Sequence, residues 1–229
     1  MGSLCIIPAR GGSKRIPRKN IKDFLGKPII AYSIEAALKS ELFDEVMVST
    51  DDKEIAEIAE KYGAKVPFMR SEANANDFAT TYDVIKEVLS YYRKSNIVFG
   101  QACCIYPCAP FVSVEKLQEA YQKLKMFDTV FPVVKYGFPI QRALTKDDND
   151  RLEFFQPKFE LSRSQDLISS YHDAGQFYWF DIEALDKNKT LMSKKTGAVV
   201  LSEMEVQDID TEIDWKIAEL KYKLQHEIS

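Results

Sequence analysis

The sequence predicts an α/β protein in which helices cover both faces of a mostly parallel sheet. Short apolar runs of strand length alternate along the chain with amphipathic segments of helical period. Several of these segments open on a residue that commonly caps helices. The composition is that of a globular chain, since 45% of the 229 residues are hydrophobic and 29% are charged. A chain of this length can bury one full core, so we expect a single domain over residues 1–229.

Each of the first four expected strands is followed by an expected helix. The strands are predicted over residues 4–8, 45–50, 64–68, 101–106 and 129–134. The helices are predicted over residues 28–40, 51–63, 80–94 and 113–126. Pro28 takes the favoured first position of its helix, and Asp51, Thr80 and Ser113 are the expected N-caps.

The alternation breaks after residue 135. Residues 136–171 show no clear period, and we interpret them as an inserted arm, the alternative being a long loop with its own core contacts. Its aromatic residues Phe154, Phe155 and Phe159 could pack on a second subunit. A return strand is expected over residues 177–180, and a last helix over residues 211–225.

Charge is unevenly distributed along the chain. The formal net charge is −4, which is unfavourable for nucleic-acid binding. Residues 10–27 nevertheless hold seven basic residues and one acid, so the rest of the chain is strongly acidic. This compact cationic segment predicts a small anionic ligand.

The remaining composition excludes several classes of protein. The four cysteines, Cys5, Cys103, Cys104 and Cys108, are expected to be reduced thiols, and their spacing with two histidines does not suit a zinc site. No apolar run approaches the length of a membrane span, and no signal peptide is visible. We therefore expect a cytoplasmic protein without a membrane partner.

The basic segment contains the first candidate site, RGGSKRIPRKN at residues 10–20, directly after the first expected strand. Adjacent glycines allow a ligand to approach the backbone, whose N–H groups can bind anions, while the basic side chains neutralise phosphate charge. Neither a Walker loop nor a GxGxxG motif is present. A basic surface turn is the alternative, but the density of charge and the position after a strand favour a triphosphate site.

The second candidate is the pair Asp208 and Asp210, which precedes the last expected helix. Carboxylates two residues apart on an extended segment point the same way and suit Mg²⁺, with Mn²⁺ as a possible substitute. The alternative is an acidic pair that only complements the helix dipole. Together with the basic loop, the pair indicates nucleotidyl or phosphoryl transfer.

The chain also resembles a known family. IPARGGSKRIPRKN at residues 7–20, LGKPIIAYSIEAAL at 25–38, the segment 48–70 and DIDTEIDW at 208–215 are similar to the CMP-sialic acid synthetases, the acylneuraminate cytidylyltransferases. Segments 104–111, 139–144 and 171–179 look most like the pseudaminic acid branch. Tyr106 and Ala174 stand where the sialic acid branch typically has Gln and Asn.

The resemblance implies a Rossmann-like nucleotide-diphospho-sugar transferase fold and a homodimer formed through the inserted arm. The implied reaction condenses CTP with a nine-carbon 2-keto acid sugar, most similar to pseudaminic acid, and releases pyrophosphate. CMP-N-acetylneuraminate and CMP-legionaminate synthesis are the nearby alternatives. A homologue that binds CTP without turnover is the alternative from another class.

Roles for individual residues follow from the same resemblance. The implied catalytic residues are Arg10, Lys19, Asp208 and Asp210, of which the two aspartates would bind the metal. The implied nucleotide-binding residues are Ala9, Arg10, Gly11, Gly12, Ser13, Lys14, Lys19, Asn20, Arg70, Thr80 and Thr81. The sugar-binding candidates are Tyr106, Gln141, Arg142, Arg163, Gln165, His172, Gln176 and Tyr178. His172 could serve as a base or as a partner of a sugar hydroxyl.

Overall fold

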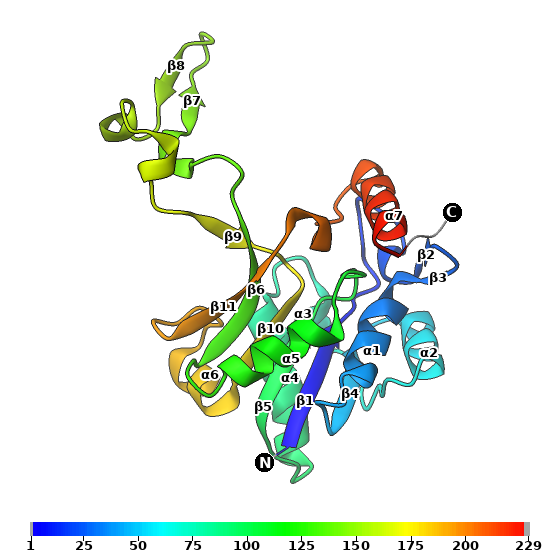
Figure 1. The fold of residues 1–229 in the computed structure, drawn as a ribbon. Helices are drawn as coiled ribbons and strands as arrows, with labels where there is room; N and C mark the ends of the chain where they lie inside the picture. The colour runs from blue at the N-terminus through cyan, green and yellow to red at the C-terminus, as the bar shows by residue number, and fades with distance from the viewer. Residues whose placement is uncertain (1, 227–229) are drawn as a thin grey trace.

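The computed structural model describes residues 2–226, which build a seven-stranded sheet, helices on both of its faces and one long excursion (Figure 1). The strands run in the order β11-β6-β10-β5-β1-β4, and β9 pairs with β6. Their bounds are β1 Gly2–Pro8, β4 Glu45–Ser49, β5 Phe99–Ile105, β6 Thr129–Lys135, β9 Tyr171–Asp173, β10 Phe177–Asp181 and β11 Thr196–Leu201. Only β9 and β10 run against the others, which confirms the mostly parallel sheet.

Two helical layers enclose the sheet. One face is covered by α1 (Ile29–Lys39), α2 (Lys53–Lys61) and α5 (Val114–Lys123), and the other by α4 (Thr81–Lys94) and α6 (Ile182–Asn188). The helix α7 (Glu212–His226) packs Trp215 against Phe24 and brings the end of the described chain beside the short strands β2 (Asp23–Phe24) and β3 (Lys27–Pro28). The α/β class with helices on both faces is therefore confirmed.

Local capping signals were reliable predictors of helix starts. Thr80 and Asp83 form the reciprocal capping box of α4, and the Ser113 hydroxyl accepts from the Lys116 amide at the start of α5. The Thr211 hydroxyl likewise accepts from the Asp214 amide at the start of α7. Pro28 is the N-cap of α1 rather than its first helical residue, so the helix begins one residue later than predicted.

Several predicted elements differ in the structure. The expected strand over residues 64–68 is reduced to isolated bridges at Lys65 and Met69, because Pro67 between them cannot donate to a ladder. The N-cap of α2 is Asp52 rather than Asp51, and α5 ends at Lys123 rather than at residue 126. The strand near residue 101 begins at Phe99. The helix α6, the strand β11 and the short α3 (Glu72–Ala75) were not predicted.

The excursion over residues 136–170 extends away from the sheet (Figure 1). It carries the hairpin of β7 (Leu144–Lys146) and β8 (Leu152–Phe154) and the short 3₁₀ turns η2 (Ile140–Arg142), η3 (Pro157–Phe159) and η4 (Ser164–Asp166). Of the three aromatics that were expected to pack on a second subunit, Phe155 is exposed, whereas Phe154 and Phe159 are half-buried. We call this segment the arm.

Two predictions from composition can be compared with the structure. All four cysteines are free thiols, and Cys5, Cys103 and Cys104 are buried in the sheet, as expected. Between residues 2 and 226, none of the helices combines the length and apolar character that crossing a membrane requires.

Candidate active site

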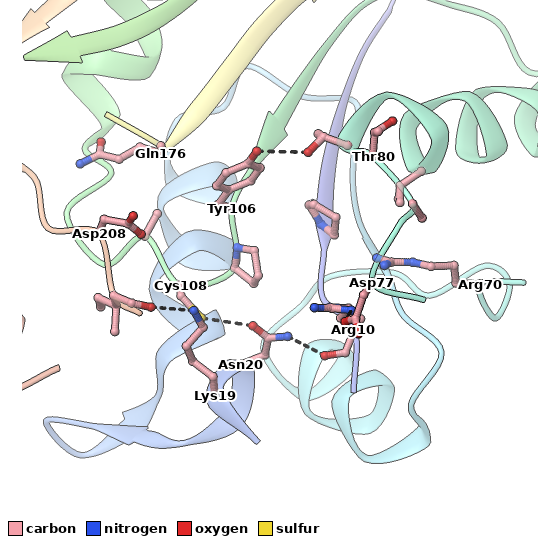
Figure 2. A pocket seen from close by; sticks show the side chains of 18 of the residues that line it. Arg10, Lys19, Asn20, Arg70, Asp77, Thr80, Tyr106, Cys108, Gln176 and Asp208 are labelled. Carbon is pink, nitrogen blue, oxygen red and sulfur yellow. Dashed lines mark hydrogen bonds and ion pairs between the residues drawn. The ribbon is translucent and has the colours of Figure 1, made fainter. Parts of the chain in front are cut away.

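A cavity of about 300 Å³ opens at the carboxyl ends of β1 and β5, where ligands bind in open α/β sheets (Figure 2). Its wall combines the basic loop that follows β1, the segment from Arg70 to α4, the loop after β5, the turn before β10 and the stretch before α7. The polar and charged residues of this wall are Arg10, Lys19, Asn20, Arg70, Asn74, Asn76, Asp77, Thr80, Thr81, Tyr106, Cys108, Gln176, Gln207 and Asp208. A second hollow, lined by Arg10, Ser13, Lys14, Arg15, Lys19 and Asn20, adjoins it.

The basic loop is held at its end by Asn20, in η1 (Lys19–Ile21). The Asn20 amide donates to the Arg10 carbonyl oxygen at 2.8 Å, and its oxygen accepts from the Cys108 thiol at 3.1 Å. Lys19 donates to the Ile209 carbonyl at 2.6 Å. Arg18 adopts a left-handed backbone (φ 57°) and pairs with Asp52 at the start of α2, which holds the pKa of that carboxyl below its ordinary value. The loop is thus anchored to three neighbouring elements.

The two adjacent glycines have different surroundings. Gly11 donates its amide to Asp51 at 2.9 Å, and a Cβ at this position would lie 2.7 Å from the carboxylate of Asp52. A Cβ on Gly12 would meet nothing within 4 Å. Gly11 is therefore required by the fold, whereas Gly12 leaves open space in front of the loop. Ala9, just before them, is fully buried and donates to the Ser49 carbonyl.

Arg10 and Lys14 point to one carboxylate, that of Asp77 in the loop between α3 and α4. Figure 2 shows Arg10 beside Asp77. Asp77 Oδ1 lies 2.5 Å from an Arg10 nitrogen, and Oδ2 pairs with Lys14. These contacts hold the pKa of Asp77 below its ordinary value. Asp77 thus occupies the cationic end of the cavity in the way that a phosphate oxygen could.

The wall on the side of α4 is polar and rigid. Arg70 is buried, and its guanidinium donates to the Ser49 hydroxyl at 3.0 Å and to the Ser49 carbonyl. Burial lowers the pKa of Arg70. Thr80 caps α4, and the Thr81 hydroxyl lies 3.1 Å from the hydroxyl of Tyr106.

The opposite wall contains Tyr106 and Gln176, whereas Tyr178, which was also predicted to bind the sugar, lies behind Tyr106 and lines the hollow beside β6 and β11. Tyr106 lies 5.4 Å from Tyr178 between ring centroids, and burial raises the pKa of both phenols. Gln176 is buried, donates its side-chain amide to the Glu205 carbonyl at 2.6 Å and accepts the Tyr106 amide on its own carbonyl at 2.8 Å. The Tyr178 hydroxyl donates to Asp173 at 2.7 Å.

The carboxylate pair divides between the cavity and the basic loop. Asp208 lines the cavity opposite Arg10 (Figure 2). Asp210 instead accepts from Arg15 at 2.8 Å and lies 3.9 Å from Lys19. Within residues 2–226, no cluster of three or more His, Cys, Asp and Glu side chains could hold a metal ion. The expectation that both carboxylates face one ligand is therefore not met in this structure, since only Asp208 lines the cavity and Asp210 is paired with Arg15.

Some predicted site residues lie elsewhere. Gln141, Arg142, Arg163 and Gln165 belong to the arm, outside the cavity wall. The Gln141 amide donates to the Ile168 carbonyl at 2.8 Å, within the arm itself. His172 lies in β9 and lines a separate hollow beside β6 and β11.

Sequence reasoning missed several cavity residues, namely Asn74, Asn76, Asp77, Cys108 and Gln207. The polar run of residues 71–77 directly after Arg70 is the signal that could have identified the first three. Cys108 was interpreted only as a core thiol, but it is partly buried at the cavity wall.

An α/β sheet with a cationic glycine loop and a carboxylate at one cavity defines the class of enzymes that transfer nucleotidyl or phosphoryl groups. The comparisons with known proteins narrow this class. The cytidylyltransferase family model matches residues 4–212, and the chain belongs to this family.

Relatives and a solved structure agree with this assignment. The chain is 44% identical to the pseudaminic acid cytidylyltransferase of Campylobacter jejuni, over 99% of both chains. It is 34% identical to the CMP-N,N'-diacetyllegionaminic acid synthase of Legionella pneumophila, again over 99% of both. The structure of CMP:2-keto-3-deoxy-manno-octonic acid synthetase in complex with CTP shares the fold, with a TM-score of 0.70, 17% identity and coverage of 99% of this chain and 100% of that one.

Proposed function

We propose that this protein condenses CTP with a nine-carbon 2-keto acid sugar, pseudaminic acid, to give the CMP-sugar and pyrophosphate. The observation that carries the proposal is one cavity that combines a cationic loop, a polar wall at Arg70, Thr80 and Thr81, and an opposite wall at Tyr106 and Gln176. Full-length similarity to a pseudaminic acid cytidylyltransferase supports the choice of both substrates.

The basic loop would hold the triphosphate. Arg10 and Lys14 already bind a carboxylate in front of the open backbone at Gly12, and Lys19 lies between the two hollows. Phosphate oxygens would take the place of the Asp77 carboxylate because they carry more charge and more acceptors. Ser13 and the loop amides would supply further donors.

The nucleoside would lie against the wall formed by Arg70, Thr80 and Thr81. Arg70 is fixed by Ser49 and needs no reorganisation to present its remaining N–H groups. Asn20 belongs to the cavity wall at the basic loop, and both polar atoms of its side-chain amide are hydrogen-bonded within the protein. We therefore assign Asn20 a role in shaping the site.

Asp208 and Asp210 would bind Mg²⁺, which offsets charge on the phosphates when it is bound. Two carboxylates suffice, since this ion usually completes its shell with water and substrate phosphate oxygens. Arg15, now paired with Asp210, would be free to move toward the phosphates.

In the reaction the anomeric hydroxyl oxygen of the sugar forms a bond to the α-phosphorus, and the bond from that phosphorus to the pyrophosphate oxygen breaks. Negative charge grows on the leaving group, and Arg10, Lys14 and Lys19, which line the second hollow, would stabilise it. The hydroxyl proton leaves to a base or to water. His172 lines another hollow, so we assign it no role as the base.

The sugar would contact the wall formed by Tyr106 and Gln176, with Tyr178 behind Tyr106. The arm residues Gln141, Arg142, Arg163 and Gln165 cannot belong to this wall within one chain as it is folded here, so they would contribute only from a second copy. The arm exposes Phe138, Leu161 and Ile168 almost fully, which favours a homodimer formed through it. We expect the enzyme to work in the cytoplasm.

The test is pyrophosphate release from CTP and Mg²⁺, with pseudaminic acid and N-acetylneuraminic acid assayed side by side. Release with pseudaminic acid alone supports the proposal. Release with N-acetylneuraminic acid alone would support the proposed reaction but identify a different sugar substrate. Legionaminic acid is assayed as a third substrate. CTP binding without product from any of the three sugars would instead indicate a non-catalytic homologue.

A further inference from the structure

Asp173, at the end of β9, uses both oxygens of its carboxylate within the protein. Oδ1 accepts from the Gly175 backbone amide at 2.8 Å, and Oδ2 accepts from the Tyr178 hydroxyl at 2.7 Å. Asp173 lies outside the wall of the main cavity and is exposed in the neighbouring hollow beside β6 and β11. Its two partners connect that hollow to the main cavity.

The contact with Gly175 fixes a turn. Gly175 has a left-handed backbone (φ 61°), and Gly175 and Gln176 line the cavity directly after it. An aspartate that accepts from the amide two residues later closes such a turn from the side. Because the Gln176 carbonyl accepts the Tyr106 amide at 2.8 Å, the turn also sets the backbone of Tyr106.

The contact with Tyr178 holds that ring beside Tyr106. A carboxylate only accepts, so the Tyr178 hydroxyl must donate to Asp173. The Tyr178 ring packs beside that of Tyr106, with 5.4 Å between the ring centroids. Tyr106 lines the cavity, and its hydroxyl lies 3.1 Å from the Thr81 hydroxyl. Asp173 therefore supports Tyr106 both through the turn and through Tyr178.

We propose that Asp173 is a positioning residue for the sugar: it fixes the turn at Gly175 and the ring of Tyr178, and through them the place of Tyr106 and Gln176 in the cavity wall. The inference rests on the proposed function, because it concerns the sugar side of that site. It assigns Asp173 no contact with the sugar.

Two variants separate the contact of the Asp173 carboxylate with Tyr178 from its contact with Gly175. Tyr178→Phe removes the phenol and leaves the turn intact. Asp173→Asn can still accept from Gly175, but its NH₂ group faces the Tyr178 oxygen, so the Tyr178 hydroxyl loses its acceptor. Tyr92→Phe is the matched control, since Tyr92 is also buried and donates to a carboxylate, that of Glu45, near the opposite end of α4.

The measurements are KM for pseudaminic acid, kcat, and the Kd for CTP in the absence of sugar. We expect Tyr178→Phe and Asp173→Asn each to raise KM for the sugar about tenfold. The Kd for CTP should change by less than about twofold, which also shows that the variants are folded. Tyr92→Phe should leave all three values unchanged.

A double-mutant cycle decides whether Asp173 acts through Tyr178. We expect the double variant to be little worse than either single one, since both remove the same contact. Additive effects would overturn the inference, as would a large effect of Tyr178→Phe without one of Asp173→Asn. An equal rise in the Kd for CTP would also overturn it, because it would indicate general damage to the fold.

Calorimetry of pseudaminic acid binding to the CTP-bound protein tests this inference independently of turnover. Binding without turnover would count against the reaction, and the same variants would then be compared by sugar affinity, with about the same tenfold loss expected. Absence of sugar binding to the wild-type protein would overturn the inference.

Discussion

The side-chain amide of Asn20 donates a hydrogen bond to the backbone carbonyl oxygen of Arg10 at 2.8 Å, so the basic loop is closed on itself. Asn20 is only 7% exposed, and its oxygen accepts from Cys108. The backbone of the loop thus takes its shape from a residue whose side-chain amide is hydrogen-bonded within the protein through both its nitrogen and its oxygen.

Replacing Asn20 with alanine should therefore weaken CTP binding by changing the loop. We expect the Kd for CTP to rise about tenfold and the free energy of unfolding to fall by about 1–2 kcal/mol, since the Arg10 carbonyl loses its partner. Calorimetry and urea denaturation measure the two quantities. Asn149→Ala on the exposed arm hairpin is the control. Unchanged CTP affinity would contradict a role for Asn20 in shaping the loop.

The Asp77 carboxylate is expected to compete with the triphosphate for Arg10 and Lys14. Asp77→Asn removes that competitor, and we expect the Kd for CTP to fall about threefold at low salt and less at high salt, because exposed ion pairs are screened. Asp150→Asn, which breaks the exposed pair with Lys146 on the arm, should have no effect. Weaker CTP binding in Asp77→Asn would show instead that Asp77 holds the loop in its binding shape.

The two glycines of the loop should respond differently to alanine. Gly11→Ala places a methyl group 2.7 Å from the Asp52 carboxylate, and we expect a loss of about 1–3 kcal/mol in unfolding free energy. Gly12→Ala meets nothing within 4 Å, so its stability should stay within about 0.5 kcal/mol of wild type. CTP affinity should nevertheless fall in Gly12→Ala, because the methyl group occupies the approach to the backbone. Equal CTP affinity in Gly12→Ala and wild type would place the triphosphate elsewhere.

From the carboxylate pair we predict that a substitution at Asp208 lowers metal-dependent turnover without weakening metal-free nucleotide binding. Asp208→Asn should lower kcat at least about a hundredfold at saturating Mg²⁺, while CTP binding in the presence of a chelator stays unchanged. Asp186→Asn, which breaks the distant pair with Arg93, is the control. Full turnover in Asp208→Asn would show that Asp208 does not bind the metal.

The sequence predicted best the features that depend on neighbouring residues. Thr80 and Ser113 were recognised as caps because their hydrogen-bond partners lie three residues away. Asp51 and Asp52 both fit a cap, and only the tertiary contact of Asp51 with Gly11 decides between them. Such a choice cannot be made from a local pattern.

The same limit applies to the site. The cationic loop was visible in its charge density, but its partner Asp77 is 67 residues from Arg10 along the chain. The pairing depends on the order of β1, β4 and α4 in space, which no local signal encodes. The antiparallel return strand was predicted at residues 177–180, whereas the short α6 and the edge strand β11, buried on alternate residues only, carry weaker patterns.

The Cys108 thiol gives a prediction that depends on pH. Burial raises its pKa from 9.0 to about 12, so the thiol is protonated at neutral pH and can donate to Asn20. Alkylating reagents attack the thiolate, and we therefore expect iodoacetamide to label native Cys108 far more slowly than the unfolded chain at pH 8. The raised pKa also means that this thiol stabilises the fold below pH 9 and that the contribution is lost as pH rises toward 12. Fragment-ion mass spectrometry separates Cys108 from Cys103 and Cys104, and rapid labelling of Cys108 at pH 8 would show that its thiol is not the donor to Asn20.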